Sequence, residues 1–413
     1  MTRYSIVIAL GAALIATGFP NTLSAAVPEK NDALRAVSTT LNQFAVDFFK
    51  NISEENRSTN LICSPVSVSM VLSMAAFGAG GDTAKEMRSG LRLPSDDAVT
   101  KSGFESLIDI LNNVKKVDLK VANKIFTASG FEVKPAFKEV TAKSFKSQAE
   151  SLDFGKAEAA SATINAWCSA QTNGLIKDVI KPDDLAAAAM VLVNAVYFKG
   201  QWKNKFRESL TQPRPFHVND KTTQDVPMMT TRYRYNYGNL PDLDAQFVEL
   251  PYQHENETDA TSMFIILPNN VDGLTKAESN LDKVNFQDLH DRHAMTDMFL
   301  YLPKFKTQSS FNLQNTLVKM GLGRMFSDNA DFTGITDNPP LKISKVLQKA
   351  VIEVNEEGSE AAAVTVGIAV AYSAIVKPIE PIEIKVDKPF IYAIVHSSSN
   401  TILFQGHITL PKN

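Results

Sequence analysis

The amino-acid sequence predicts a single α+β domain, because helix-like patterns come first and strand-like patterns gather in the second half of the chain. The 413 residues are 44% hydrophobic and 21% charged, which is typical of a globular protein with a large core. A chain of this length can hold two or more domains, but no internal repeat or Gly/Ser-rich linker divides it. The formal net charge of -3 provides no overall basic field, so nucleic acid is not an expected partner.

Four segments carry apolar residues at helical spacing. The first is residues 34–50. The second begins at Ser64-Pro65, with Ser as the cap and Pro at the first helical position, and runs to Gly78. Residues 104–114 and 159–171 are the other two helix candidates.

The strand candidates follow in the second half. Residues 191–198 are almost continuously apolar, which is typical of a strand buried on both faces. Further candidates are residues 264–267, 298–302, 350–354, 391–396 and 402–408.

The first 26 residues have the features of a secretory signal peptide. Arg3 provides the positive charge near the N-terminus, and residues 6–16 form an apolar run too short to cross a bilayer. Small residues then precede a cleavage point before Val27. Pro20 argues against the alternative, an uncleaved anchor helix. No later apolar run is long enough to span a membrane. We therefore expect residues 27–413 to form a secreted, extracellular protein with no membrane partner.

Secretion gives meaning to three N-glycosylation sequons, which begin at Asn51, Asn56 and Asn256. The chain has two cysteines, Cys63 and Cys168, both in apolar-periodic surroundings. Two buried free thiols are favoured, and one disulfide between them is the alternative.

Motifs of common enzyme and cofactor sites are absent from the sequence. It contains no G-x-S-x-G, P-loop, H-E-x-x-H or C-x-x-C motif. His290 and His293 have the spacing of one helix face, but the sequence positions no acidic or Cys partner beside them. We expect no catalytic residue, no metal and no cofactor.

A long Ala- and Val-rich stretch, residues 358–381, is predicted to be one exposed loop after the strand that ends at Val354. The run of alanines would also suit a short helix, but the β-branched residues after it favour an extended chain. Alternate positions are small: Ser359, Ala361, Ala363, Thr365, Gly367 and Ala369. A period of two with one small face suits a strand that slides between existing strands over a packed core.

Five ordered motifs across the mature chain resemble those of the serpin family, with an overall similarity to arthropod members. They are Asn60-Leu61-Ile62-Cys63-Ser64-Pro65-Val66-Ser67, Leu192-Val193-Asn194-Ala195-Val196-Tyr197-Phe198-Lys199-Gly200 with Trp202, Leu302-Pro303-Lys304-Phe305, Asp387-Lys388-Pro389-Phe390, and the hinge Glu356-Glu357-Gly358-Ser359-Glu360-Ala361-Ala362-Ala363. The resemblance implies three β-sheets, about nine helices and an exposed reactive-centre loop at about residues 358–382.

By resemblance, the chain is a secreted, monomeric inhibitor that traps a serine protease. The protease attacks the loop, forms a covalent acyl complex, and is trapped when the loop inserts into the central sheet. The resemblance places the opening region of that sheet at Ser64, Ser67, Asn194, Trp202, Lys304 and Gln348. It also pairs Glu356 with Lys304 near Trp202. Gln348 departs from the family, whose members often carry His there, and the stretch from Ser373 to Pro389 looks longer than usual.

Two other functions compete with inhibition. A serpin without inhibitory activity, acting in binding, carriage or storage, is expected to carry bulky or charged residues in its hinge. The residues of this hinge are small apart from Val364. An enzyme is disfavoured by the missing motifs. A sulfated polysaccharide is a weaker candidate partner, because Lys115, Lys116, Lys120 and Lys124 follow a predicted helix, although a solvated basic turn is the favoured explanation of these lysines.

The bait bond is predicted to be Tyr372-Ser373. In this family the hinge Glu usually lies sixteen residues before the bait position, and sixteen residues after Glu356 is Tyr372. Tyr372 is the only aromatic residue of the loop and suits the apolar pocket of a chymotrypsin-like protease. Lys377 would indicate a trypsin-like target, but Pro378 follows it. The alternatives Ala369 and Ala371, which suit an elastase, remain open.

Overall fold

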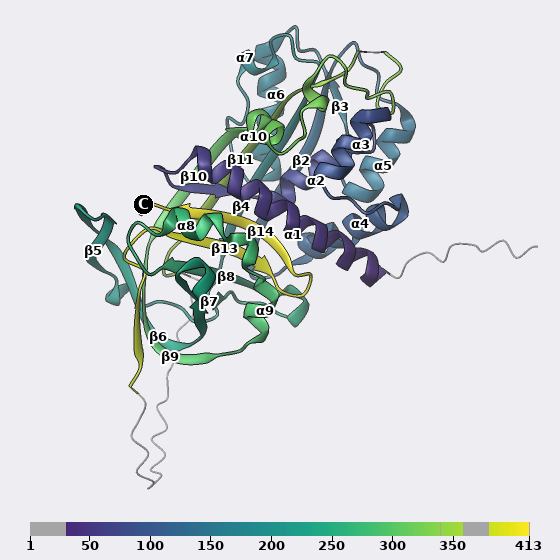
Figure 1. Cartoon of the computed structure of the whole chain (residues 1–413). Helices are drawn as coiled ribbons and strands as arrows, with labels where there is room; N and C mark the ends of the chain where they lie inside the picture. Colours follow the sequence, from purple (N-terminus) through teal and green to yellow (C-terminus); the bar gives the residue numbers. More distant parts are fainter. Residues whose placement is uncertain (1–29, 339, 358–379, 413) are drawn as a thin grey trace, which may run out of the picture.

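The computed structural model describes residues 30–338, 340–357 and 380–412, which form an α+β fold (Figure 1). The predicted signal peptide, the hinge from Gly358 onward, and the bait candidates from Ala369 to Lys377 lie outside the described residues. The helices are α1 (Lys30–Glu55), α2 (Pro65–Ala76), α3 (Gly81–Gly90), α4 (Asp97–Asn113), α5 (Pro135–Phe145), α6 (Ala157–Gln171), α7 (Pro182–Leu185), α8 (Leu274–Ser279), α9 (Phe286–Asp291) and α10 (Gln314–Lys319).

The strands alternate with these helices in the first half and dominate the second. They are β1 (Leu61–Cys63), β2 (Val117–Ala128), β3 (Glu150–Leu152), β4 (Met190–Gly200), β5 (Gln212–Asn219), β6 (Thr222–Leu240), β7 (Ala245–Pro251), β8 (Thr261–Pro268), β9 (Met295–Pro303), β10 (Phe305–Asn312), β11 (Ile343–Val354), β12 (Ile382–Lys385), β13 (Phe390–His396) and β14 (Thr401–Ile408). No described helix has both the length and the apolar character needed to cross a bilayer.

A five-stranded sheet carries the candidate site, in the order β10-β11-β4-β2-β3. The central strand β4 and its neighbour β11 run parallel, with register from Met190 opposite Ile343 to Phe198 opposite Ile352. We call the boundary between them the β4/β11 seam. The other neighbours of these two strands, β2 and β10, are antiparallel to them.

The second sheet joins nine strands through β6. Its main path is β1-β14-β13-β8-β7-β6-β9-β12, and β5 pairs with β6 beside it. The long β6 pairs with β5 and β9 over most of its length and with β7 only from Asn236 to Leu240. The resemblance implies three sheets, but two of them are joined here into one hydrogen-bonded sheet, because the 19-residue strand β6 belongs to both.

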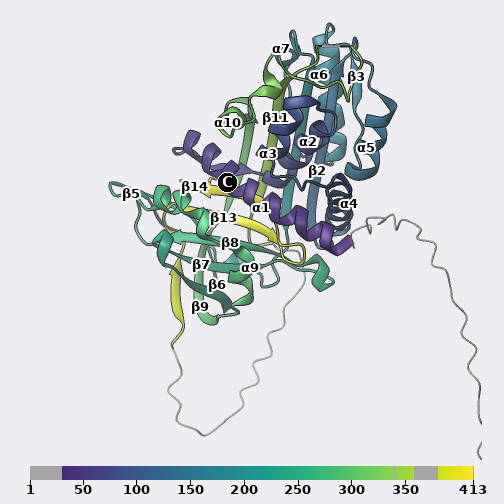
Figure 2. The same cartoon turned by 45° about the vertical axis from the view of Figure 1, so that its right-hand side comes forward.

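The core lies between the two sheets around α2, all of whose residues are buried. The long helix α1 packs against α4 and β14 (Figure 2). The apolar part of β4 is buried on both faces: Leu192, Val196 and Phe198 join the central core, whereas Val191 and Val193 pack in a second cluster with α6. The continuous apolar run of this strand is explained by that double burial.

Candidate functional site

Buried polar side chains connect β4 and β11 at the middle of the seam. Gln348 on β11 lies opposite Asn194 on β4, and its Nε2 donates to Asn194 Oδ1 at 2.6 Å. The two residues are 1% and 0% exposed. A buried amide that loses its partner costs free energy, so this contact favours the closed seam.

The same side chains bind the start of α2. Gln348 Nε2 also donates to Ser64 O at 3.0 Å, and Ser64 N donates back to Gln348 Oε1 at 3.2 Å. Ser64 occupies the predicted cap position of α2, but its hydroxyl makes no cap and donates instead to Leu403 O at 2.8 Å. The cap prediction was therefore right for the position and wrong for the hydrogen bond, because a β14 carbonyl competes for the hydroxyl.

Asn123 on β2 completes this network and was missed by the sequence reasoning. Ser67 Oγ donates to Asn123 Oδ1 at 3.0 Å, and Asn194 Nδ2 donates to both of these oxygens. We call Ser64, Ser67, Asn123, Asn194 and Gln348 the seam network. A polar residue inside an alternating stretch with two lysines gives no local signal that it faces a buried cluster.

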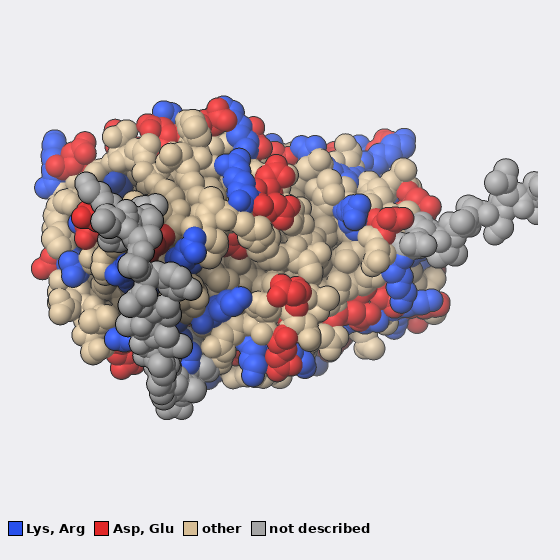
Figure 3. Space-filling view, turned by 90° about the horizontal axis from the view of Figure 1, so that it is seen from below, with Lys and Arg blue, Asp and Glu red and all other residues tan. Residues whose placement is uncertain are grey.

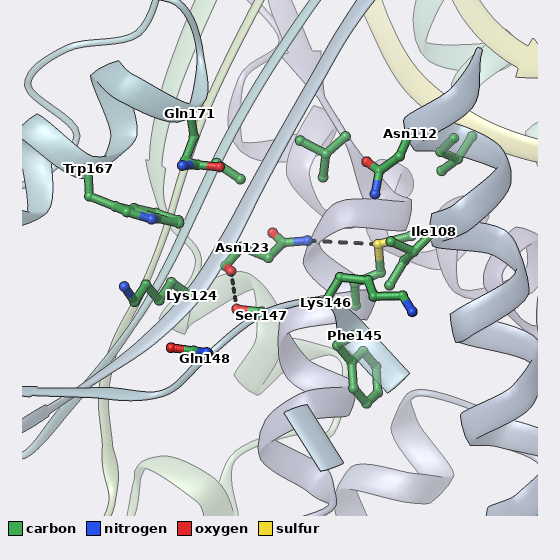
Figure 4. A pocket seen from close by; sticks show the side chains of 14 residues that line it. Ile108, Asn112, Asn123, Lys124, Phe145, Lys146, Ser147, Gln148, Trp167 and Gln171 are labelled. Carbon is green, nitrogen blue, oxygen red and sulfur yellow. Dashed lines mark hydrogen bonds between the residues drawn. The ribbon is translucent and has the colours of Figure 1, made fainter. Parts of the chain in front are cut away.

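The seam network borders a pocket of about 340 Å³ on its Asn123 side (Figure 4). Ile108 of α4, Phe145 of α5 and Trp167 of α6 contribute to its walls. Ser147 Oγ donates to the backbone oxygen of Asn123 at 2.6 Å on the pocket side. This pocket leaves space beside β2, the neighbour of β4 in the sheet.

An ion pair marks the end of the seam at which β11 stops. Lys304 Nζ lies 2.8 Å from Oε2 of Glu356, and Thr211 Oγ1 donates to the other carboxylate oxygen at 2.7 Å. Burial alone raises the pKa of the Glu356 carboxyl, but the hydrogen bonds from Lys304 and Thr211 outweigh it and hold the pKa below its ordinary value. The Lys304–Glu356 pair inferred by resemblance is present, and Thr211 is a partner that no motif indicated.

Trp202 holds the chain segment just before this ion pair. Its Nε1 donates to Asn355 O at 2.9 Å, and its ring stacks on Tyr252 with centroids 4.5 Å apart. Nearby, Lys199 of β4 lies 3.4 Å from Glu353 of β11, across the seam. The residues expected in the opening region thus fall into two groups, the seam network and the contacts around Glu356.

The three sequons differ in exposure. Asn256, Glu257 and Thr258 are all exposed in the turn between β7 and β8. Asn51 and Asn56 are half-buried, and their Nδ2 atoms donate to the carbonyls of Asp47 and Ile52 within α1. Only the Asn256 sequon is exposed at all three of its residues, at the start of the short 3-10 helix Glu257–Asp259.

The other candidate groups have ordinary structural partners. Cys63 and Cys168 are buried and unpaired, and burial raises both thiol pKa values, that of Cys168 to about 12. His290 Nδ1 lies 2.7 Å from the buried Glu249, a partner that the sequence did not reveal. Among the described residues, no group of three or more His, Cys, Asp or Glu is placed to hold a metal ion.

Three of the four lysines considered for polysaccharide binding are paired with acids. Lys116 lies 3.6 Å from Glu255, Lys120 lies 3.1 Å from Asp118, and Lys124 lies 2.6 Å from Glu150. Lys120 and Lys124 belong to β2 rather than to a basic turn. At the end of the molecule seen in Figure 3, basic and acidic side chains are interspersed.

Comparison with known proteins agrees with this geometry. The model of the family "Serpin (serine protease inhibitor)" matches residues 39–411. Antichymotrypsin-2 of Bombyx mori is 35% identical over 88% of this chain and 96% of its own, and the leukocyte elastase inhibitor of Bos taurus is 36% identical over 92% and 100%. The crystal structure of Serpin48 from the insect Tenebrio molitor is 30% identical, covers 92% of this chain and 99% of its own, and has a TM-score of 0.78. The chain therefore belongs to the serpin family.

Proposed function

We propose that this serpin is a secreted inhibitor of a serine protease, and that it works by inserting its cleaved reactive loop into the β4/β11 seam. The observation that carries the proposal is the parallel pairing of β4 and β11, with Glu356 anchored at the end from which the chain continues. A chain that turns back after Glu356 enters the seam antiparallel to both strands. It replaces one parallel pairing by two antiparallel ones, which are slightly more stable per residue.

The seam network supports this role because it is the buried contact that insertion has to rearrange. On the core side, β4 and β11 carry apolar side chains to either side of it, Leu192 and Val196 on β4 and Val346 and Ala350 on β11. A strand with one small face can therefore lie between them over the core without a clash. Ser359, Ala361 and Ala363 supply such a face in the sequence. The name of the leukocyte elastase inhibitor, a relative matched over its full length, agrees with a protease partner.

The trapping step is an interrupted acyl transfer. The protease serine attacks the carbonyl carbon of Tyr372, the peptide bond to Ser373 breaks, and the new Ser373 amine takes the proton delivered by the protease histidine. An ester then joins Tyr372 to the protease. Inserting residues 359–372 carries that ester roughly 45 Å at about 3.3 Å per residue, and the displacement distorts the protease before water completes hydrolysis.

The target class is proposed from the bait residue. Tyr372 fits an apolar primary pocket, so a chymotrypsin-like protease is the first choice. Ala369 and Ala371 would suit an elastase, and Lys377 a trypsin-like enzyme. The relatives named antichymotrypsin-2, antitrypsin and leukocyte elastase inhibitor span all three target classes.

We also propose that the mature protein is a monomer released after cleavage before Val27. A sulfated polysaccharide partner receives little support, since three of its four candidate lysines are already paired. Retention of the mature chain on immobilised heparin at physiological ionic strength, compared with a Lys115→Gln/Lys116→Gln variant, tests that partner.

A substitution at Ser359 tests the insertion mechanism. Ser359→Arg puts a bulky charge on the inserting face, where burial without a partner costs several kcal/mol. Insertion should slow, so water should hydrolyse the ester to the protease before insertion is complete. The number of inhibitor molecules consumed per protease trapped should therefore rise several-fold. Glu360→Arg, on the opposite face, is the matched control and should change this ratio far less. An unchanged ratio in Ser359→Arg would refute the assigned inserting face.

A further inference from the structure

The β4/β11 seam is covered, on the side away from the central core, by residues 157–185, which comprise α6, the segment after it and α7. We call these residues the strap. Ile164 of α6 and Leu185 of α7 pack in one buried apolar cluster with Val193 of β4 and Leu347 of β11. Because that cluster includes side chains from both strands, the strap lies across the seam.

The strap is held together by the side chain of Asn165 on α6. Its Oδ1 accepts from the backbone amides of Val179 and Ile180 at 2.8 and 3.1 Å, and its Nδ2 donates to Ile180 O at 2.8 Å. The segment after α6 is therefore fastened to the helix, so a pull on one end of the strap is transmitted to the other.

Lys124 of β2 anchors the strap on one side of the seam (Figure 4). Its Nζ lies 2.6 Å from Glu150 of β3 and 5.2 Å from the ring centroids of both Phe126 and Trp167, the latter on α6. The Lys124 side chain is only 14% exposed. An ammonium group removed from water between a carboxylate and two rings is held by cation–π attraction as well as by charge.

Two lysines of β11 anchor the strap on the other side of the seam. Lys345 Nζ lies 2.6 Å from Asp184 of α7, and Lys349 Nζ donates to the backbone oxygen of Lys177. Burial alone raises the pKa of the Asp184 carboxyl, but hydrogen bonds from Lys345 and from the Lys181 amide hold the pKa below its ordinary value. The pair is therefore charged at neutral pH.

The two anchors differ in how easily water can replace them. The side chains of Lys345 and Asp184 are 29% and 24% exposed, so water reaches both charges and screens their attraction. Lys124 is half as exposed as Lys345 and gives up two ring contacts in addition to its carboxylate when it is released. The anchor on β11 is the weaker of the two.

A strand that enters the seam strains the strap in two ways. It separates β11 from β4, to which β2 is paired along its whole length from Val117 to Thr127, so it draws the two anchors apart. It also places side chains under the strap. Val364, Val366 and Ile368 alternate with the small residues of the loop sequence, so a strand whose small face lies over the core presents these bulky groups to the strap.

We propose that the strap stays on β2 through Lys124 and is released from β11, so that the Lys345–Asp184 pair is a latch whose opening limits the rate of strand insertion. Lys345 is a positioning residue in this scheme, because it acts on insertion only through the strap. The inference rests on the proposed insertion of the reactive loop into the seam.

Annealing of a peptide measures insertion without any protease. The probe is a synthetic, fluorescein-labelled peptide with the sequence of residues 359–372, incubated with the intact mature protein and followed by native electrophoresis. Lys345→Gln should speed annealing about three-fold or more, because the latch no longer has to open. Lys345→Arg keeps the charge and should anneal close to the parent rate.

Lys319→Gln is the matched control. Lys319 lies 2.6 Å from Glu55, the same distance as in the latch, but this pair joins α10 to α1 and does not cross the seam. Its loss should lower the melting temperature about as much as Lys345→Gln does and leave the annealing rate unchanged. The comparison separates opening of the latch from general destabilisation.

Cross-links test which anchor is released. Lys345→Cys/Asp184→Cys joined by a short bis-maleimide should block annealing, whereas Lys124→Cys/Trp167→Cys joined in the same way should still anneal. The uncoupled form of each protein is its control. The native thiols of Cys63 and Cys168 are 0% exposed, so the reagent should not reach them in the folded protein.

The outcomes distinguish the latch from the mechanism on which it rests. An unchanged rate in Lys345→Gln, an equal acceleration in Lys319→Gln, or free annealing of the protein cross-linked between positions 184 and 345 would overturn the latch alone. Annealing blocked by both cross-links would refute release on the β11 side only. A parent protein that never anneals the peptide would instead overturn the insertion mechanism, and the latch with it.

Discussion

Nε2 of Gln348 lies 2.6 Å from Oδ1 of Asn194, and this hydrogen bond crosses the seam between β11 and β4. Gln348 also holds the backbone of Ser64 with both its donor and its acceptor. A strand that enters the seam has to separate β11 from β4, so it has to break the bond to Asn194. The strength of this contact should therefore control both the stability of the closed form and the rate of opening.

Gln348→Ala should lower the stability of the closed form by about 3 kcal/mol, because Ser64 and Asn194 lose buried partners. Gln348→His should restore much of that loss at pH 8, where a neutral imidazole both donates and accepts. At pH 5.5 the imidazolium no longer accepts from Ser64 N, so the His variant should lose stability that the parent keeps. Thermal melting of the three proteins at both pH values measures this. Equal pH dependence of the His variant and the parent would contradict the role of Gln348 Oε1 as an acceptor.

Lys304→Ala should destabilise the closed form by about 2 kcal/mol, since the buried Glu356 carboxylate loses its charged partner. The loosened end of β11 should also make loop insertion occur more readily without a protease, so activity should decay faster on storage at 37 °C. Lys306→Ala is the matched control on the same strand region, because its contact with Glu353 is long and exposed. Melting temperatures and residual inhibition over time check both effects. Equal losses in the two variants would argue against a special role of the Glu356 pair.

Acid should destabilise the fold through His396. This residue is fully buried, and desolvation lowers its pKa to about 4, below the ordinary value near 6.5. The unfolded chain therefore binds a proton that the folded chain excludes, and stability falls as the pH drops from about 6.5 to about 4. The full loss is about 3 kcal/mol. His396→Gln should flatten this part of the pH profile in urea titrations, whereas His217→Gln, an exposed control on β5, should not. An unchanged slope in His396→Gln would contradict the assignment.

Glycan should be attached at Asn256 in preference to the other two sequons, because Asn256 is exposed and its backbone is extended, whereas Asn51 and Asn56 are half-buried in or beside α1. Protein secreted from a eukaryotic host should lose mass on glycosidase treatment, and Asn256→Gln should remove most of that shift. A shift that persists in Asn256→Gln and disappears in Asn51→Gln/Asn56→Gln would reverse the preference.

The sequence predicted elements whose pattern of burial is regular along their length. The apolar run of β4 and the entirely buried α2 show their burial in composition, so both were recognisable. β2 was not predicted, because its lysines mask a strand whose Asn123 faces a buried cluster. Within the seam network, Gln348 is 154 residues from Asn194 along the sequence and 284 residues from Ser64. Family resemblance indicated which residues gather at the seam, whereas the hydrogen-bond directions and the roles of Asn123 and Thr211 required the structure.

The most direct test of the account is incubation of the mature protein with chymotrypsin, followed by denaturing electrophoresis and mass spectrometry. The account predicts a detergent-stable covalent complex and a released C-terminal fragment that begins at Ser373, with both lost in Tyr372→Ala. Complete hydrolysis of the loop without a stable complex would contradict the trapping mechanism. A fragment that begins at Pro378, with trypsin trapped and chymotrypsin not, would contradict the assigned bait bond.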